Sequence, residues 1–219
     1  MNEGEYPGIS DRWARMIFHL PYAFHAKRIY VKQFIKEREA KGLWENDQVE
    51  HQFSSIEGLQ YIDAKEAHIQ YEAYLREVGK SALYQAFADE KLEKAQRAGM
   101  ETGNLYTASI FLALMSSLDA DWKDKSELAG ERLGFVAYGS GAKSKVFEGV
   151  LQPGWEQVVS QFKLDEKLKK RTEISYDTYK SLHTGCQKTS VEPKKGRWGL
   201  ERIGTESIYL GARYYRVLA

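Results

Sequence analysis

A histidine at position 19 stands where several α/β folds place reactive groups. His19 follows the apolar run 13–18 and precedes Pro21, so it is expected at the end of a buried strand. A histidine in that position can donate a hydrogen bond to a developing oxyanion, or it can shuttle a proton near neutral pH. The alternative is a structural histidine that bonds a backbone carbonyl.

A second candidate is Asn104, which follows Gly103 at the start of a long apolar segment. Its amide could donate a hydrogen bond to a substrate carbonyl. Asn is also a preferred N-cap residue of helices, so a plain helix cap is the alternative.

The third candidate is a glycine-rich turn formed by Tyr138, Gly139, Ser140 and Gly141. Two glycines around a serine let the backbone turn sharply and let a ligand approach closely. The serine hydroxyl and the neighbouring amides suit a thioester or a carboxylate. The turn is not a nucleophile elbow, because a second strand and not a helix is expected after it. The alternative is an ordinary hairpin turn.

A set of basic side chains lies close to these positions in the sequence, and cations of this kind bind phosphates. A solvated helix face is the alternative explanation. The set comprises Lys27, Arg28 and Lys32 in the segment after His19, and Lys143 and Lys145 after the glycine turn.

Other familiar chemistry is not supported by the sequence. Neither a phosphate-binding Walker loop nor a dinucleotide-binding glycine motif follows a predicted strand. Acidic and histidine residues do not cluster at metal-ligand spacing, so no metal site is expected. Cys186, the single cysteine, lies in a polar stretch beside glycine and is a poor candidate for a nucleophile.

Composition points to a soluble globular protein. The 219 residues are 42% apolar and 29% charged, and 32 basic against 31 acidic residues give a net charge of +1. This balance argues against a general nucleic-acid binder. Apolar runs fall short of the roughly 18–20 residues of a membrane span, and the acidic start lacks the features of a signal peptide. We therefore expect a cytoplasmic protein without nucleic-acid or membrane partners.

The elements that must position these residues alternate between strands and helices, which is typical of an α/β layered domain. Residues 13–18 predict a buried strand, and Pro21 suits the first turn of the helix that follows. A polar, mostly helical region at about 37–99 contains one helix capped by Asp63 and ended by Gly79. A second helix there is capped by Ser81 and ended by Gly99.

The rest of the chain, from residue 103 onward, begins with a more apolar segment. Residues 103–118 are apolar nearly all round, which predicts a helix buried on most sides. Alternating residues predict that a half-buried strand at 143–151 pairs through a tight turn with the buried strand before it. The other expected elements are a strand at 132–138, helices at 155–162 and 166–183, and a last strand at 207–215 with Ile208, Leu210 and Ala212 facing one way.

Taken together, these motifs resemble the C-terminal half of hydroxymethylglutaryl-CoA synthase, a member of the thiolase superfamily. The resemblance runs through nearly the whole chain and is weakest at 37–99. The matching stretches are FHLPY at 18–22, GNLYTAS at 103–109, LAGERLGFVAYGSG at 128–141, RTEISY at 171–176 and the tail at 208–216.

The resemblance implies one half of a thiolase-like α/β fold, with a mixed sheet packed with helices. Residues 1–219 would then form a single C-terminal domain that carries the polar helical insertion at about 37–99. That family condenses acetyl-CoA with acetoacetyl-CoA to 3-hydroxy-3-methylglutaryl-CoA, on the mevalonate route to isoprenoids. CoA thioesters are its substrates, and no further cofactor is expected.

The resemblance also implies roles for the candidate residues. His19 would hydrogen-bond the acetoacetyl thioester oxygen, and Asn104 and Ser140 would orient the acyl groups beside Tyr138 and Gly139. Fixed donors of this kind are worth about 3–4 kcal/mol each in the transition state. Lys27 and Arg28 would hold the phosphates of CoA. The lysine that the family commonly has five residues after the histidine is Phe24 here.

In the family, the nucleophilic cysteine and the general-acid/base glutamate precede the histidine motif, which begins about eighteen residues into this sequence. We therefore expect a fragment, a separately encoded half or a truncated reading frame, which needs a missing N-terminal half or partner chain. We also expect dimers in the complete enzyme and no acetyl-enzyme from this chain alone. Labelled acetyl-CoA tests this, and stable labelling of Cys186 would contradict it. Two alternatives remain: a β-branching synthase that acts on polyketides bound to acyl-carrier protein, and a non-catalytic acyl-CoA-binding domain.

Overall fold

The computed structural model describes residues 8–44, 64–139, 143–191 and 198–217. Its internal contacts divide the chain into two compact units, Met1–Lys169 and Lys170–Ala219. All of the candidate site residues belong to the first unit. Each unit is described by itself.

A mixed three-stranded sheet lies at the centre of the first unit, in the order β1-β2-β3. Strand β1 (Arg15–Phe18) pairs in parallel with β2 (Arg132–Tyr138), and β2 pairs antiparallel with β3 (Ser144–Val150). The three strands predicted from the sequence are therefore confirmed. Strand β3 is more exposed than its alternating pattern suggested, because only Glu148 and Gly149 are partly covered.

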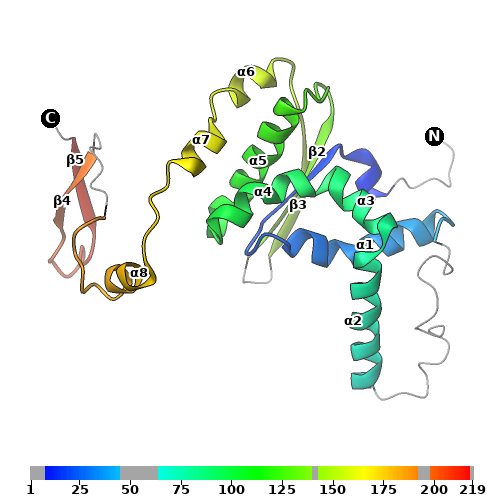
Figure 1. Ribbon diagram of the computed structural model, residues 1–219, viewed down its shortest axis with the longest axis horizontal. Coiled ribbons are helices and arrows are strands. Elements are labelled where there is room, and N and C mark those ends of the chain that lie inside the picture. Colours follow the sequence, from blue (N-terminus) through cyan, green and yellow to red (C-terminus); the bar gives the residue numbers. More distant parts are fainter. Residues whose placement is uncertain (1–7, 45–63, 140–142, 192–197, 218–219) are drawn as a thin grey trace. The chain divides into compact units, whose positions relative to one another are not determined.

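Helices pack against this sheet and bury β1 almost completely (Figure 1). Helices α4 and α5 lie side by side, and both contact β1. The short helices α6 and α7 contact α5. The helices of the first unit are α1 (His25–Ala40), α2 (Ala64–Lys80), α3 (Ala82–Lys91), α4 (Glu93–Thr102), α5 (Ser109–Lys123), α6 (Trp155–Val159) and α7 (Leu164–Lys169), with short 3-10 turns η1 (Ile9–Arg12) and η4 (Tyr106–Ala108).

The predicted helical region at about 37–99 is helical over most of its described residues, but not all of its predicted helix ends are confirmed. Asp63, the predicted cap of the first helix, lies outside the described residues. The Ser81 cap is confirmed, because its hydroxyl accepts a hydrogen bond of 3.2 Å from the Tyr84 N–H. The helix predicted from there to Gly99 is instead broken at Leu92 and continues to Thr102. Gly103, at φ +75°, is the glycine that ends it, since it adopts a conformation that other residues avoid.

The apolar helix predicted at 103–118 begins later and extends further. Tyr106, the first residue of η4, has a positive φ of 49°, and α5 starts only at Ser109 and runs to Lys123. The expectation that this helix is buried on most sides is wrong for its first turn, where Phe111 is 64% exposed. Asn104 consequently lies outside the helix that it was expected to start.

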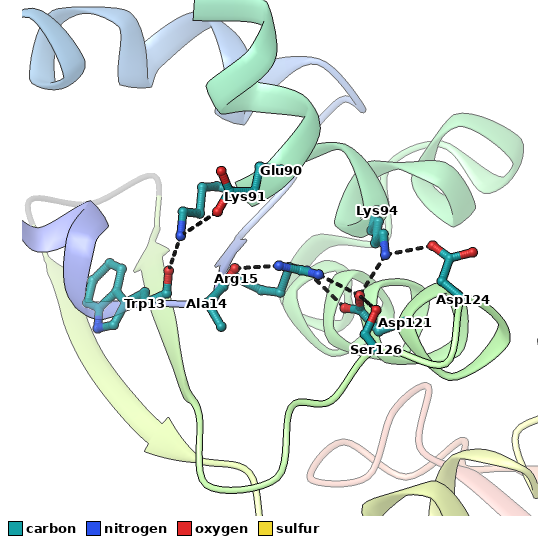
Figure 2. A network of polar contacts seen from close by, with 9 residues as sticks. All are labelled: Trp13, Ala14, Arg15, Glu90, Lys91, Lys94, Asp121, Asp124 and Ser126. Carbon is teal, nitrogen blue, oxygen red and sulfur yellow. Dashed lines mark hydrogen bonds and ion pairs between the residues drawn. The ribbon is translucent and has the colours of Figure 1, made fainter.

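A buried carboxylate ties the start of β1 to the end of α5. Asp121 has no exposed surface, and the Arg15 guanidinium donates to its two oxygens at 2.7 and 2.9 Å. The Lys94 ammonium and the Ser126 hydroxyl also donate to it, at 2.7 and 3.0 Å. Figure 2 shows Arg15 and Lys94 converging on this carboxylate from β1 and α4. Two cations thus compensate one desolvated anion.

A close contact between an indole ring and a glycine fixes the segment before β1. The Trp13 ring lies against Gly134 of β2, where a Cβ atom would come within 1.9 Å of the ring. The Trp13 indole N–H donates to Glu148 of β3 at 3.0 Å, which holds the ring in this place. Gly134 is therefore required by a close approach and not by backbone conformation.

The second unit consists of α8 (Tyr176–His183) and a two-stranded antiparallel sheet of β4 (Trp198–Ile203) and β5 (Arg213–Val217). The single helix predicted at 166–183 is wrong, since α7 ends at Lys169 and Ser175 caps the separate helix α8. The strand predicted at 207–215 is also misplaced. Ile208 and Leu210 lie in a turn, and β5 starts after Gly211, whose φ is +83°.

None of the helices that the structure describes is both long and apolar enough to cross a membrane.

Candidate functional site

The parallel pairing of β1 and β2 brings His19 and Tyr138 together. Both residues lie at the carboxyl ends of their strands, and the His19 N–H continues the ladder by donating to the Val136 carbonyl at 3.0 Å. The His19 and Tyr138 rings meet edge to face, with centroids 5.0 Å apart. The strand edge thus places an imidazole and a phenol side by side, and His19 lies at the end of a strand as the sequence predicted.

Ser109, which the sequence analysis did not single out, contacts the other side of His19. Its hydroxyl oxygen lies 2.9 Å from His19 Nδ1 and accepts a hydrogen bond of 3.0 Å from the Leu20 N–H. Ser109 is only 5% exposed. Its place at the first residue of an apolar helix was the signal available in the sequence, but nothing there linked it to a residue ninety positions away.

His25 was also missed, and it extends the cluster. Its Nε2 lies 2.9 Å from the Tyr138 hydroxyl, and the Tyr22 ring packs edge to face against it. Burial lowers the pKa of His25, and the nearby His19 and Arg28 lower it further. Burial, with a smaller contribution from Tyr22, raises the pKa of Tyr138. The geometry therefore favours a neutral His25 beside a protonated phenol.

The other predicted acyl-binding residues with described contacts, Asn104 and Gly139, form their hydrogen bonds away from His19. The Asn104 side chain is exposed, and its Oδ1 accepts a hydrogen bond of 2.7 Å from the Tyr106 N–H. The described contacts therefore join it to its own loop and not to His19. Gly139 is exposed at the end of β2, where its N–H donates to the Lys143 carbonyl at 3.3 Å. Ser140 lies outside the described residues.

A cavity of about 610 Å³ opens beside His25, between the first half of α1 and the second half of α2. Five of its lining side chains are cationic and one is anionic, and aromatic and aliphatic groups form the rest. The charged ones are Lys27, Arg28, Lys32, Arg76, Lys80 and Glu72. Such a lining suits a ligand that combines phosphates with an apolar arm.

The cationic side chains of this cavity differ in whether carboxylates already pair with them. Lys27 forms ion pairs with Glu93 and, at 3.8 Å, with Asp89, so carboxylates already neutralise it. Arg28 is exposed and forms no ion pair with another described residue. Of the two predicted phosphate ligands, Arg28 is therefore the better placed to receive one. Lys143 and Lys145 lie by the β2–β3 turn and do not line this cavity.

Cys186 lies in the second unit and is exposed, with a hydrogen bond from the Thr184 hydroxyl to its sulfur at 3.3 Å. Within the described ranges, no group of three or more histidine, cysteine or acidic side chains is arranged to hold a metal ion.

Comparison with known proteins decides the family. The family model for the hydroxymethylglutaryl-coenzyme A synthase C-terminal region matches residues 2–194. The chain belongs to this family. The resemblance drawn from the five sequence stretches is thereby confirmed, as is the C-terminal assignment.

Curated relatives agree with this assignment. Hydroxymethylglutaryl-CoA synthase of Schizosaccharomyces pombe is 28% identical over 211 residues, which are 91% of this chain and 43% of the relative. The Haloferax volcanii enzyme of the same name is 29% identical over 110 residues, covering 50% of this chain and 25% of the relative. A polyketide-biosynthesis 3-hydroxy-3-methylglutaryl-ACP synthase of Bacillus subtilis, PksG, is 26% identical over 136 residues, covering 55% of this chain and 29% of the relative.

The fold is shared with solved synthases. MvaS in complex with 3-hydroxy-3-methylglutaryl coenzyme A superposes with a TM-score of 0.63 at 21% identity, covering 97% of this chain and 43% of that one. This confirms the predicted thiolase-like α/β fold. The chain spans less than half the length of these relatives, from 25% to 43% of it.

Proposed function

We propose that this chain is the C-terminal part of an acyl-CoA condensing enzyme that joins acetyl-CoA to acetoacetyl-CoA and yields 3-hydroxy-3-methylglutaryl-CoA. The observation that carries the proposal is the position of His19. It stands at the carboxyl end of β1, held by Ser109 and Tyr138. Tyr138 in turn contacts His25, which lines a cavity with a cationic lining. Family membership supplies the reaction class.

His19 acts in this proposal as a hydrogen-bond donor to the thioester oxygen of the acetoacetyl group. A donor fixed where negative charge develops stabilises the transition state more than the ground state, because it needs no reorganisation during the reaction. The ring is fixed in this way, since Ser109 bonds one edge and Tyr138 packs against it.

The CoA portion lies along α1 in this proposal. Arg28 receives a phosphate, and Lys27 contributes to the positive potential although Glu93 and Asp89 pair with it. The apolar wall that includes Ile29 and Leu75 accommodates the pantetheine arm. Phe24, in place of the family's lysine, adds to that apolar wall.

The acyl groups are oriented by side chains around His19. Asn104 and Ser140 retain the role that the resemblance gives them, with Tyr138 and Gly139 beside them. For this role the loop must turn the Asn104 amide toward His19, because the hydrogen bond from the Tyr106 N–H to its oxygen holds the side chain in its own loop.

The nucleophilic cysteine and the general-acid/base glutamate belong, in this proposal, to the part of the synthase that these 219 residues do not cover. The chain alone then binds acyl-CoA but forms no acetyl-enzyme. The complete enzyme works in the cytoplasm as a dimer, on the mevalonate route.

Calorimetric titration with acetoacetyl-CoA tests the proposal. Loss of one hydrogen bond to the ligand in His19→Ala should weaken binding up to about ten-fold, and Ser140→Ala should have a similar or smaller effect. His183→Ala, at an exposed position in the second unit, is the control and should bind like the unchanged chain. Equal affinity of all three variants would overturn the site assignment.

A second candidate is condensation on polyketides carried by acyl-carrier protein, which the similarity to PksG favours. Titration with the carrier-bound acetoacetyl group decides between them. Preference for the carrier-bound form would replace the CoA-based proposal, and equal binding of free acetoacetyl-CoA would retain it. Binding without condensation in the completed enzyme would leave a non-catalytic acyl-CoA-binding domain.

A further inference from the structure

We propose that Ser109 is a positioning residue that fixes the neutral tautomer of His19, with the proton on Nε2. The inference deepens the proposed function, because it states which nitrogen presents the donor to the thioester oxygen. It rests on that function only for the identity of the acceptor.

The hydrogen-bond inventory of Ser109 leads to this assignment. A serine hydroxyl offers one proton and two lone pairs. The Leu20 N–H occupies one lone pair at 3.0 Å. Because the side chain is buried, its proton needs an acceptor within the protein.

The acceptor that the described contacts provide is His19 Nδ1, at 2.9 Å. If Nδ1 carried its own proton, it would donate to the serine oxygen. The serine proton would then have no acceptor among the described contacts. The satisfied arrangement therefore leaves Nδ1 unprotonated. In a neutral imidazole the proton then lies on Nε2.

The same contacts stop the ring from turning over. The Leu20 N–H anchors the serine oxygen from the residue that follows His19, and the His19 N–H is bonded to Val136 of β2. The Tyr138 ring packs edge to face against the imidazole. A flip would replace an acceptor nitrogen by a carbon at Ser109 and leave the serine proton unpaired.

The chemical consequence concerns the free nitrogen. With the proton on Nε2, this nitrogen donates to a carbonyl oxygen; in the other tautomer it would present a lone pair and repel that oxygen. Ser109 would thus act on catalysis through His19 without touching the substrate.

Nitrogen-15 NMR of the full chain with labelled histidine tests the inference directly. The spectrum is recorded above pH 8, where imidazoles are neutral, and the two-bond couplings show which nitrogen carries the proton. The chain has five histidines, and comparison with His19→Gln identifies the signals of His19. We expect the Nε2–H pattern for His19 in the unchanged chain.

Variants separate positioning from general structure. Ser109→Ala should give a mixture of tautomers, and Ser109→Thr, which keeps the hydroxyl, should restore the Nε2–H pattern. Tyr138→Phe removes the bond to His25 but keeps the ring against His19, so it should leave the pattern unchanged. An Nδ1–H pattern in the unchanged chain, which needs no variant to fold, would overturn the inference. A pure Nε2–H pattern in Ser109→Ala would overturn it as well.

A binding measurement distinguishes this inference from the proposed function. Acetoacetyl-CoA should bind Ser109→Ala up to about ten-fold more weakly than the unchanged chain, with Ser109→Thr close to normal. If the unchanged chain shows the Nε2–H pattern but binds no acetoacetyl-CoA, the proposed function fails and the tautomer assignment stands.

Discussion

The two ends of β1 face the same helix but differ in chemistry. At its start, Arg15 bonds Asp121 near the end of α5; at its close, Ser109 at the start of α5 bonds His19 and Leu20. Helix α5 therefore runs antiparallel to β1 and is hydrogen-bonded to it, or to the residues just after it, at both ends. The contact at the Asp121 end is between compensated charges, and the contact at the Ser109 end consists of neutral hydrogen bonds.

The difference shows how one strand–helix pair, β1 and α5, can serve stability at one end and function at the other. At the Asp121 end, two cations and a hydroxyl share the carboxylate oxygens, so the carboxylate has little capacity left for a ligand. At the His19 end, Nδ1 is occupied by Ser109, while Nε2 has no hydrogen bond to another described residue. The cationic cavity begins near this second end, at His25. We expect substitutions at the first end to affect folding and those at the second to affect ligands.

The largest effect should come from Asp121→Ala. It leaves the largely buried Arg15 guanidinium without its counter-charge and Lys94 with Asp124 alone, so the free energy of unfolding should fall by about 3–5 kcal/mol. Urea unfolding followed by circular dichroism measures this. Asp124→Ala is the matched control, because Asp124 pairs with the same Lys94 from an exposed position and should change stability little. Equal losses in both variants would mean that burial of the pair is not what matters.

A smaller loss is expected from Gly134→Ala, which tests the packing before β1. The new methyl group would meet the Trp13 ring, and moving that ring disturbs its bond to Glu148, so about 1–3 kcal/mol should be lost. Gly149→Ala in the neighbouring strand is the control, since its methyl group would lie 3.7 Å from Phe135 in ordinary contact. A Gly134→Ala chain as stable as the control would show that Trp13 repacks without cost.

These features differ in how visible they were in the sequence. Strands β1, β2 and β3 were predicted because their apolar runs are short and bounded by turn residues. Helix ends were not, because two glycines, Gly99 and Gly103, stood near one helix end and only the backbone conformation distinguishes them. Strand β4 was missed altogether, since it is almost entirely exposed and has no buried pattern to detect.

The site was predicted only in part for a similar reason. His19 could be placed at a strand end, because a short apolar run precedes it. Its contact with Tyr138 was not predicted, since the sequence did not show that their two strands pair. Ser109 and His25 could not be placed at the site, since a serine or histidine in a helix has no local signal for a contact that tertiary packing alone creates. The Lys27 prediction overlooked Glu93, whose carboxylate comes from a helix distant in sequence.

The smallest expected effect is a pH dependence at the His19 end. The pKa of His25 is lowered in the folded chain by burial and by His19 and Arg28, while Tyr138 and Tyr22 also pack against it. Between that lowered pKa and the unfolded value of about 6.5, the unfolded chain binds more protons than the folded one. The contribution of His25 to stability is therefore complete above about pH 6.5 and is lost as the pH falls through its folded pKa.

Unfolding by urea at a series of pH values from neutral to mildly acidic measures this loss. His25→Gln, which has no proton to gain, should flatten the decline relative to the unchanged chain. His183→Gln, exposed in the second unit, is the matched control and should keep the original slope. If His25→Gln also kept the original slope, the loss of stability at low pH would come from groups other than His25. The contrast between a neutral His19 end and a charged Asp121 end would then no longer rest on His25.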